Sequence, residues 1–232
     1  MDIMIAFIIV TYKTPRSEVA RLEKEIASIG FQNYKVYVID NSTNNRGFAA
    51  GMNEGIQKGL KDRADLFINI SPDISFKNLD EKKIQEVTAK FDIAGFAMRQ
   101  EGVIYYGGEI DKWRMSGGLI RTKPKKRFTE VDFASGPFMM IKRKVIEKIG
   151  LWDESYFMYY EDVDFCYRAR KAGFAVGTDT DFTFDHFEVS KHNPEKEKWL
   201  GRSRRRFLFK YGNLFQFIYE IVFFIKNKSS YL

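Results

Sequence analysis

The sequence predicts an α/β protein with a mainly parallel, Rossmann-like sheet flanked by helices and a helical appendage at its C-terminal end. Short apolar runs alternate with segments whose apolar residues recur at helical spacing, which is the pattern of βαβ units. Hydrophobic residues make up 44% and charged residues 30% of the chain, a globular composition that excludes general disorder. A length of 232 residues fits one domain with a small addition.

The first 98 residues contain four predicted strands, over residues 3–10, 34–39, 66–70 and 92–98. Three predicted helices lie between them: one from Pro15 to Gly30, one ending near Leu60, and one over 82–90. Pro favours the first turn of a helix and Gly the position after its last turn. Regular alternation of this kind predicts parallel pairing of the strands.

The chain changes character after residue 98. Residues 99–130 are rich in glycine and carry a basic run at 123–127, which predicts an insertion with weak strands and a mobile loop. Strand and turn signals return over 131–141, followed by a short helix over 143–149. A further helix is expected to begin near Glu161 and to end near Gly173, and a last strand to end near His186.

Polar clusters follow three of the predicted strands, at residues 11–12, 40–42 and 71–73. Ligands of open α/β sheets bind outside the carboxyl ends of the strands, so a nucleotide-type site is expected at this edge. Polar loops after strands are also common without any ligand. Topology alone therefore leaves both interpretations open.

The acidic segment at 161–164 opens a predicted helix. Acids in a first turn complement the helix dipole, which is one sufficient explanation. However, Asp162 shares a helical face with the small residues Cys166 and Ala169, which predicts that it points inward, where a carboxylate can act as a general base. Asp164 lies about 200° further round the helix and should point elsewhere.

Six motifs in a characteristic order carry a resemblance to a known family. They are Ile9-Val10-Thr11-Tyr12, Val38-Ile39-Asp40-Asn41-Ser42, the segment 45–53, Ser71-Pro72-Asp73, the segment 135–140 and Tyr160-Glu161-Asp162-Val163-Asp164. Together they resemble family 2 glycosyltransferases with the GT-A fold, and most closely the rhamnosyltransferase-like branch. The likeness covers about residues 3–192, so we assign residues 1–192 to a GT-A domain and 193–232 to a basic amphipathic helical tail.

The resemblance implies inverting transfer of one sugar from a UDP- or dTDP-sugar to an acceptor hydroxyl in surface glycan biosynthesis, with a glycan or lipid-linked acceptor. Thr11 and Tyr12 would contact the pyrimidine base, and Asp40 would accept a hydrogen bond from its ring N–H. Asp162 matches the general base, with Glu161 beside it.

The resemblance also implies a divalent cation, Mg²⁺ or Mn²⁺, on the donor diphosphate. Asp73 matches the acid that meets the metal, and His186 matches a histidine that completes the metal site in some members. Many relatives carry two acids at this point, whereas Ser71-Pro72-Asp73 provides a single acid. Dependence on the metal is therefore expected to be weaker than in those relatives.

The tail holds most of the chain's net charge of +7. Apolar residues at 214, 217, 218, 221, 222 and 225 form a helical stripe, with basic residues at 202–206 before it and at 226 and 228 after it. Two interpretations stay open: peripheral contact with a membrane through 202–228, or packing on the domain or on a second subunit of a homodimer. No nucleic-acid reader motif accompanies the basic residues, so nucleic acid is not an expected partner.

The expected compartment is the cytoplasm, with peripheral attachment to the inner membrane face as an option. The single cysteine fits a reducing compartment, and no apolar run reaches the roughly 20 residues of a membrane span. Two other functions stay open: a non-catalytic nucleotide- or glycan-binding module on the same fold, and a nucleotidyltransferase. Residues 10–13 lack the glycines that a nucleotidyltransferase would need.

Overall fold

The computed structural model describes residues 3–188 and 194–228, and the expected domain boundary at residue 192 lies outside them. The strands are β1 (Ile5–Thr11), β2 (Tyr34–Asp40), β3 (Leu66–Ile70), β4 (Ile74–Ser75), β5 (Ile93–Gln100), β6 (Val103–Tyr105), β7 (Gly108–Asp111), β8 (Ser116–Leu119), β9 (Phe128–Glu130), β10 (Phe138–Lys142) and β11 (Val176–His186). The helices are α1 (Arg16–Ala27), α2 (Phe48–Lys61), α3 (Glu81–Lys90), α4 (Arg143–Ile149), α5 (Glu161–Lys171), α6 (Pro194–Tyr211) and α7 (Leu214–Lys228).

The described residues form one nine-stranded sheet, with the central order β2-β1-β3-β10-β5-β11-β4, and a separate β7–β8 hairpin. Strands β1, β2 and β3 pair in parallel, and so do β5 and β11. β10 lies between β3 and β5 and runs antiparallel to both. The five strands β1, β2, β3, β5 and β11 therefore all point the same way, opposite to β10. The predicted mainly parallel α/β sheet is confirmed, and the insertion at 99–130 forms the short strands β6 to β9.

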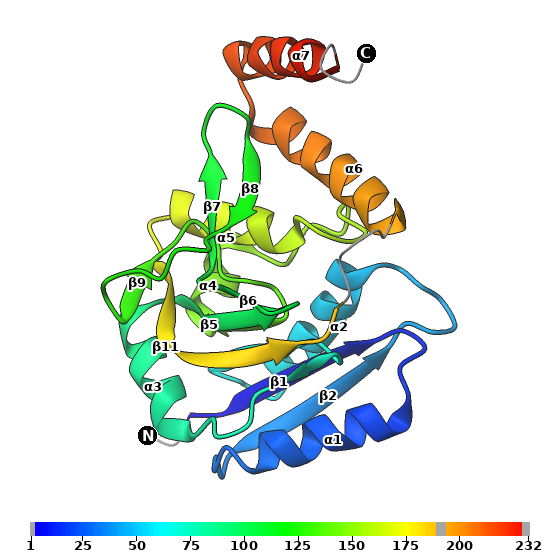
Figure 1. Ribbon diagram of the computed structural model, residues 1–232. Coiled ribbons are helices and arrows are strands. Elements are labelled where there is room, and N and C mark those ends of the chain that lie inside the picture. Colours follow the sequence, from blue (N-terminus) through cyan, green and yellow to red (C-terminus); the bar gives the residue numbers. More distant parts are fainter. Residues whose placement is uncertain (1–2, 189–193, 229–232) are drawn as a thin grey trace.

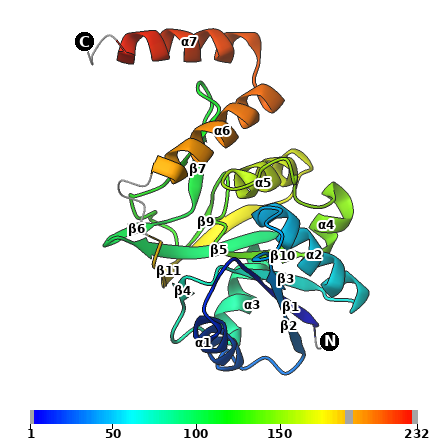
Figure 2. The ribbon, with the colours of Figure 1, turned by 90° about the vertical axis from the view of Figure 1, so that its right-hand side faces the viewer.

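The sheet is covered on both faces. Helices α1 and α3 pack on one face, and α2, α4 and α5 pack on the other (Figure 2). Strand β1 is buried on both sides, with Phe7 facing α1 and Ile8 facing α2. A strand buried on both faces reads as a continuous apolar run, which is why β1 could be predicted from sequence.

Helix α2 lies unusually close to β1 because three glycines line its inner face. A Cβ atom on Gly55 would lie 2.4 Å from Cγ2 of Ile8, and one on Gly51 would lie 2.6 Å from Cγ1 of Val10. Gly59 meets Phe67 of β3 in the same way. This close approach sets the N-terminus of α2, and the loop before it, directly behind the carboxyl end of β1.

The tail forms two helices. Helix α6 lies against the domain and leads to α7, which lies at the far end of the molecule (Figure 1). Phe207 and Leu208 of α6 are buried in the same apolar core as α2 and α5. Asp164 is fully buried between α5 and α6, where it accepts hydrogen bonds from Lys210 and Tyr211. Among the described residues, no helix is both long and apolar enough to cross a membrane.

Candidate functional site

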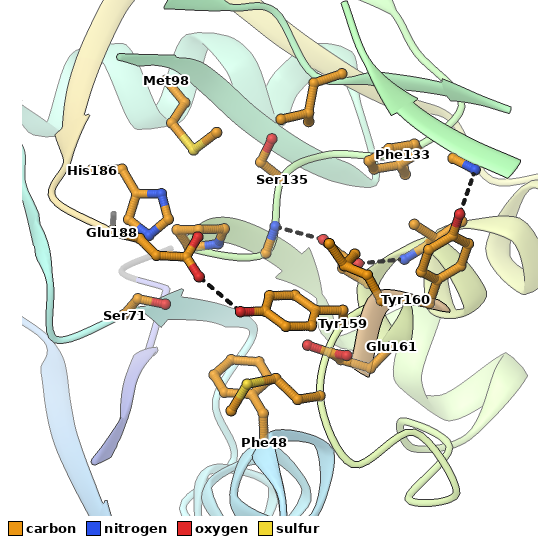
Figure 3. A pocket seen from close by; sticks show the side chains of 18 of the residues that line it. Phe48, Ser71, Met98, Phe133, Ser135, Tyr159, Tyr160, Glu161, His186 and Glu188 are labelled. Carbon is orange, nitrogen blue, oxygen red and sulfur yellow. Dashed lines mark hydrogen bonds between the residues drawn. The ribbon is translucent and has the colours of Figure 1, made fainter. Parts of the chain in front are cut away.

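Two cavities open along the edge of the sheet where the parallel strands end. The first, of about 660 Å³, lies over the ends of β1 and β2 and is lined by Val10, Thr11, Tyr12, Lys13, Thr14, Pro15, Glu18, Asn41, Asn45, Gly47, Phe48, Pro72, Asp73, Met158 and Phe187. We call it the strand-end cavity. The second, of about 360 Å³, lies at the N-terminus of α5 and includes Glu161 and Asp162 in its wall. We call it the carboxylate cavity (Figure 3).

The two cavities adjoin at three shared wall residues, Phe48, Asp73 and Met158. Of the residues predicted from sequence, Thr11 and Tyr12 line the strand-end cavity, Glu161, Asp162 and His186 line the carboxylate cavity, and Asp73 lines both. Asp40 lies at the end of β2 with an exposed carboxylate and lines neither. The structure thus brings six of the seven predicted residues to two connected cavities.

The wall of the strand-end cavity is built from the ends of β1 and β2 and the loop before α2. Thr11 is buried, and it lies opposite Asp40 in the parallel pairing of β1 with β2. Backbone N–H of Ser42 donates to Asp40 Oδ1 at 2.8 Å, and hydrogen bonds from Ser42 lower the pKa of Asp40. Asn41 Nδ2 donates to the carbonyl of Gly47 at 2.9 Å, which ties the loop to the strand end. Its Oδ1 is buried with no partner in the described part of the chain.

A strained turn places the two carboxylates of the second cavity. Tyr159 and Tyr160 both adopt left-handed backbone conformations, with φ of 65° and 68°, immediately before α5 begins at Glu161. Each such residue costs roughly 1–2 kcal/mol, so the surrounding contacts must hold the turn. The hydroxyl of Tyr160 accepts a hydrogen bond from Gly117 N–H at 3.1 Å, and that of Tyr159 donates to Glu188 at 2.8 Å (Figure 3).

Asp162 is held by backbone donors. Its Oδ2 accepts from Gly136 N–H at 3.0 Å and its Oδ1 from Val163 N–H at 2.8 Å. Asn69 of β3 in turn donates to the carbonyl of Gly136. The central sheet therefore holds Gly136, and Gly136 holds the carboxylate of Asp162. As predicted, Cys166 is fully buried on the same helix, and Asp162 is half-buried at the cavity wall.

Glu161 and Asp162 differ in how well their negative charge is supported. Burial raises the pKa of Asp162, while hydrogen bonds from Val163 and Gly136 oppose that rise. Burial and the neighbouring charge of Asp162 raise the pKa of Glu161 well above its ordinary value, and Glu161 Oε2 is buried without a hydrogen-bond partner among the described residues. Because hydrogen bonds to a carboxylate favour the ionised form, Asp162 ionises before Glu161.

Asp73 and His186 meet at the boundary of the two cavities. Strand β4, which follows Asp73, pairs with the end of β11, and Phe187 N–H donates to the carbonyl of Asp73 at 2.8 Å. Asp73 Oδ2 therefore lies 3.4 Å from His186 Nε2. Burial opposes ionisation of Asp73, but the hydrogen bond and charge of His186 lower the pKa of this carboxyl overall.

A carboxylate oxygen and an imidazole nitrogen on one side of a cavity are suitable ligands for Mn²⁺ or Mg²⁺. Nδ1 of His186 is buried with no partner among the described residues, and Nε2 is the nitrogen that faces Asp73. No group of three or more His, Cys, Asp or Glu side chains that could hold a metal occurs in the described ranges. Asp73 and His186 thus fit a cation whose remaining ligands come from a diphosphate and water.

Three further residues of the carboxylate cavity were not predicted. Glu188 accepts hydrogen bonds from Tyr159 and Gln100 and forms an ion pair with Lys196 of α6. Lys196 and Leu200 belong to the segment assigned to the tail, yet they line this cavity. Glu188 and Lys196 belong to no motif in the sequence. Their place in this cavity becomes visible only through contacts between segments that lie far apart in the chain.

Comparison with known proteins gives relatives that are all named as transferases of sugars. A low-salt glycan biosynthesis hexosyltransferase of Haloferax volcanii is 32% identical over 150 residues, covering 61% of this chain and 48% of the relative. A dTDP-rhamnosyl transferase of Shigella flexneri is 27% identical over 211 residues, covering 80% and 70%. An N-acetylglucosaminyl-diphospho-decaprenol L-rhamnosyltransferase of Mycobacterium tuberculosis is 41% identical over 61 residues, covering 26% and 19%. The chain is therefore similar to curated hexosyltransferases and rhamnosyltransferases, in agreement with the resemblance that its motifs carry.

Comparison with models of protein families gives no match. The chain spans about half the length of its Haloferax relative. Its fold is the predicted GT-A fold: a structure of GalNAc-T7 with UDP, GalNAc and Mn²⁺ superposes with a TM-score of 0.63 at 12% identity, covering 92% of this chain and 49% of that one. The protein A197 from STIV superposes with a TM-score of 0.53 at 16% identity, covering 81% and 87%.

Proposed function

We propose that this chain is an inverting glycosyltransferase that moves one sugar from a UDP- or dTDP-sugar to an acceptor hydroxyl in glycan biosynthesis. The observation that carries the proposal is the arrangement of the cavities: a carboxylate held by two backbone donors faces one cavity, and that cavity joins another at Asp73. One cavity suits a nucleotide and the other suits the reacting hydroxyl. The junction between them is where the sugar would lie.

In the proposed reaction, the nucleotide occupies the strand-end cavity. Thr11 and Tyr12 flank the base. Asp40 accepts a hydrogen bond from the ring N–H of the base, which must extend past Ser42 to reach it. The low pKa of Asp40 keeps that carboxylate ionised as a hydrogen-bond acceptor. Asp73 and His186 would hold a divalent cation, which supplies charge stabilisation to the departing diphosphate.

The acceptor enters the carboxylate cavity with its hydroxyl facing Asp162. Asp162 takes the hydroxyl proton as the acceptor oxygen forms its bond to the anomeric carbon. The bond from that carbon to the diphosphate breaks on the opposite face, and the nucleoside diphosphate leaves with the electron pair. One positioned base is enough for a single displacement with inversion, and it typically contributes 10²–10⁴-fold.

The apolar part of the cavity wall limits competing hydrolysis. Phe48 and Met158 lie at the junction of the two cavities and Tyr159 lines the carboxylate cavity, where they would exclude water from the anomeric carbon. The relatives suggest the acceptor class: one is named for rhamnosyl transfer to a decaprenol-linked sugar and another for low-salt glycan biosynthesis. We propose a glycan or lipid-linked acceptor for this chain as well.

A donor screen tests the proposed function. UDP- and dTDP-linked hexoses and deoxyhexoses are incubated with the protein in Mn²⁺, in Mg²⁺ or in EDTA, and released nucleoside diphosphate is measured. We expect release from at least one donor, stimulated by metal and weakened in Asp73→Asn. Binding of nucleotide without release from any donor, with or without added acceptor glycans, would instead support a non-catalytic binding module.

A further inference from the structure

Helix α7 contacts the rest of the molecule through a half-buried face that carries Gln216, Phe217, Glu220 and Phe223. Gln216 Nε2 donates to the carbonyl of Lys112 at 2.7 Å, and Glu220 forms ion pairs with Arg114 of the β7–β8 turn at 3.2 Å and with Arg204 of α6 at 2.5 Å. Gln216 and Glu220 lie four residues apart and so share one face of the helix. The orientation of α7 is therefore set by these polar contacts, together with Phe217, which packs against the apolar core, and Phe223, whose ring lies under Arg114.

The opposite face of α7 is apolar and exposed. It carries Leu214, Phe215, Ile218, Tyr219, Ile221 and Val222, with Phe215 76% and Leu214 70% exposed. Trp113 at the hairpin tip and Phe209 at the end of α6 extend this surface, and their side chains are 67% and 72% exposed. We call these eight residues the apolar platform. They are eight of the fourteen exposed large hydrophobic side chains in the described part of the chain, gathered at one end of the molecule (Figure 1).

An ordinary surface helix buries its apolar stripe against the core, whereas α7 buries only part of its apolar surface there and leaves most of it exposed. Exposed apolar surfaces of this extent mark sites that contact another molecule or a membrane. Because Glu220 is tied inward through two arginines, α7 cannot turn its exposed apolar face onto its own domain without breaking both ion pairs. The partner must therefore come from outside the chain.

The charge around the platform favours a lipid surface over a second copy of the chain. Seven Lys or Arg and one Glu occur over residues 202–228, a balance of +6. Arg205 and Arg206 are exposed on α6, close in sequence to Phe209, and Lys226 and Lys228 follow the apolar stripe. Two such basic surfaces would repel each other, whereas anionic headgroups would neutralise them.

The side-chain types fit the same occupant. Trp113 and Tyr219 lie side by side, with ring centroids 6.1 Å apart, and amphipathic aromatic rings are enriched at the headgroup level of membranes. With 15 residues, α7 is roughly 22 Å long, too short to cross a hydrocarbon core of about 30 Å but suited to lie in its surface. We propose that the apolar platform docks this chain on an anionic lipid surface.

The inference goes beyond the proposed transfer reaction, and it is tested without donor or acceptor. The full chain is sedimented with vesicles of phosphatidylcholine alone and of phosphatidylcholine with an equal amount of phosphatidylglycerol. We expect binding to the anionic vesicles, weaker binding to the neutral ones, and a decrease with added salt because exposed charges are screened. The double variant Phe215→Ser/Ile218→Ser should partition at least about tenfold less, because two large apolar side chains no longer enter the bilayer.

A matched control is Val38→Ser, which removes an apolar side chain that is 40% exposed on β2, away from the platform. It should bind vesicles like the wild type, and all three proteins should unfold at the same temperature because the replaced side chains are exposed. Wild-type protein that stays in the supernatant with anionic vesicles would overturn the proposal. So would equal vesicle binding by the double variant, or a wild-type dimer by light scattering that binds no vesicles and that the double variant dissociates.

Discussion

The two cavities of the site are built in different ways. The strand-end cavity is formed largely by residues that directly follow β1 and β2, and its polar groups include the exposed Tyr12. The carboxylate cavity is formed by contacts between distant segments: Asn69 fixes Gly136, Gly136 fixes Asp162, and Tyr159 bonds Glu188. The strand-end cavity has the accessibility that ligand binding needs, whereas the carboxylate cavity has the rigidity and burial that proton transfer needs. Variants in the two should therefore have separable effects.

The largest effect is expected from Asp162→Asn. The change keeps the size of the side chain and removes its basicity, so the rate of sugar transfer should fall by about 10²–10⁴-fold. Wild-type transfer should fall at acidic pH as Asp162 becomes protonated, with a midpoint above the ordinary aspartate value because burial raises its pKa. Initial rates over a pH series measure both. Undiminished transfer by Asp162→Asn would rule out its role as base.

Asp73→Asn should have the next largest effect. Loss of this carboxylate should weaken the proposed cation binding at the junction of the cavities, and transfer in Mn²⁺ should fall by about 10²-fold. His186→Gln should weaken the response to Mn²⁺ in the same direction. Asp185→Asn is the matched control, since Asp185 precedes His186 in β11 but pairs with Arg99 on the surface. A metal titration that is identical for Asp73→Asn and the wild type would remove Asp73 from the metal site.

Glu161→Gln should affect stability more than transfer. Because burial and the charge of Asp162 raise the pKa of Glu161 in the folded state, its protonated form favours folding, and stability is lost as pH rises through that raised pKa. Glutamine remains neutral, so the variant should gain about 2–4 °C in Tm near pH 8 and little near pH 5. Thermal unfolding at both pH values measures this. A larger gain at the acidic pH would contradict the sign of the shift.

The smallest effect is expected from Asp40→Asn. Its carboxylate is exposed, so loss of one charged hydrogen bond to the base should weaken nucleotide affinity by about tenfold or less. The rate of transfer at saturating donor should be unchanged. Asn41→Ala should disturb binding more, because it also releases the loop that Asn41 ties to the carbonyl of Gly47. A larger loss for Asp40→Asn than for Asn41→Ala would show that Asp40 dominates base recognition.

The strands and helices before residue 98 could be predicted because their signals are local. The buried run of β1 and the polar strand ends depend only on neighbouring residues, so the α/β class and the site edge followed from sequence. The antiparallel placement of β10 between β3 and β5 depends on residues about 44–48 positions apart for β5 and about 68–76 positions apart for β3, and it carries no local signal.

Helical spacing within α5 predicted that Asp164 points away from Asp162. It did not predict which distant residues contact Asp164. Its partners Lys210 and Tyr211 lie on α6, 46 and 47 residues later. The basic run at 202–206 gave the same difficulty, because its charges left membrane contact and packing on the domain or on a second subunit equally open. Arg204 is instead paired with Glu220, and Phe207 beside the run is fully buried.

The division of labour between the two cavities is tested most directly by calorimetric titration of UDP and dTDP into Asp162→Asn beside the wild type. We expect whichever nucleotide binds the wild type to bind the variant with the same affinity within about twofold, while transfer is lost. A variant that loses nucleotide affinity in parallel with transfer would show instead that Asp162 holds the donor, and the two cavities would then not have separate roles.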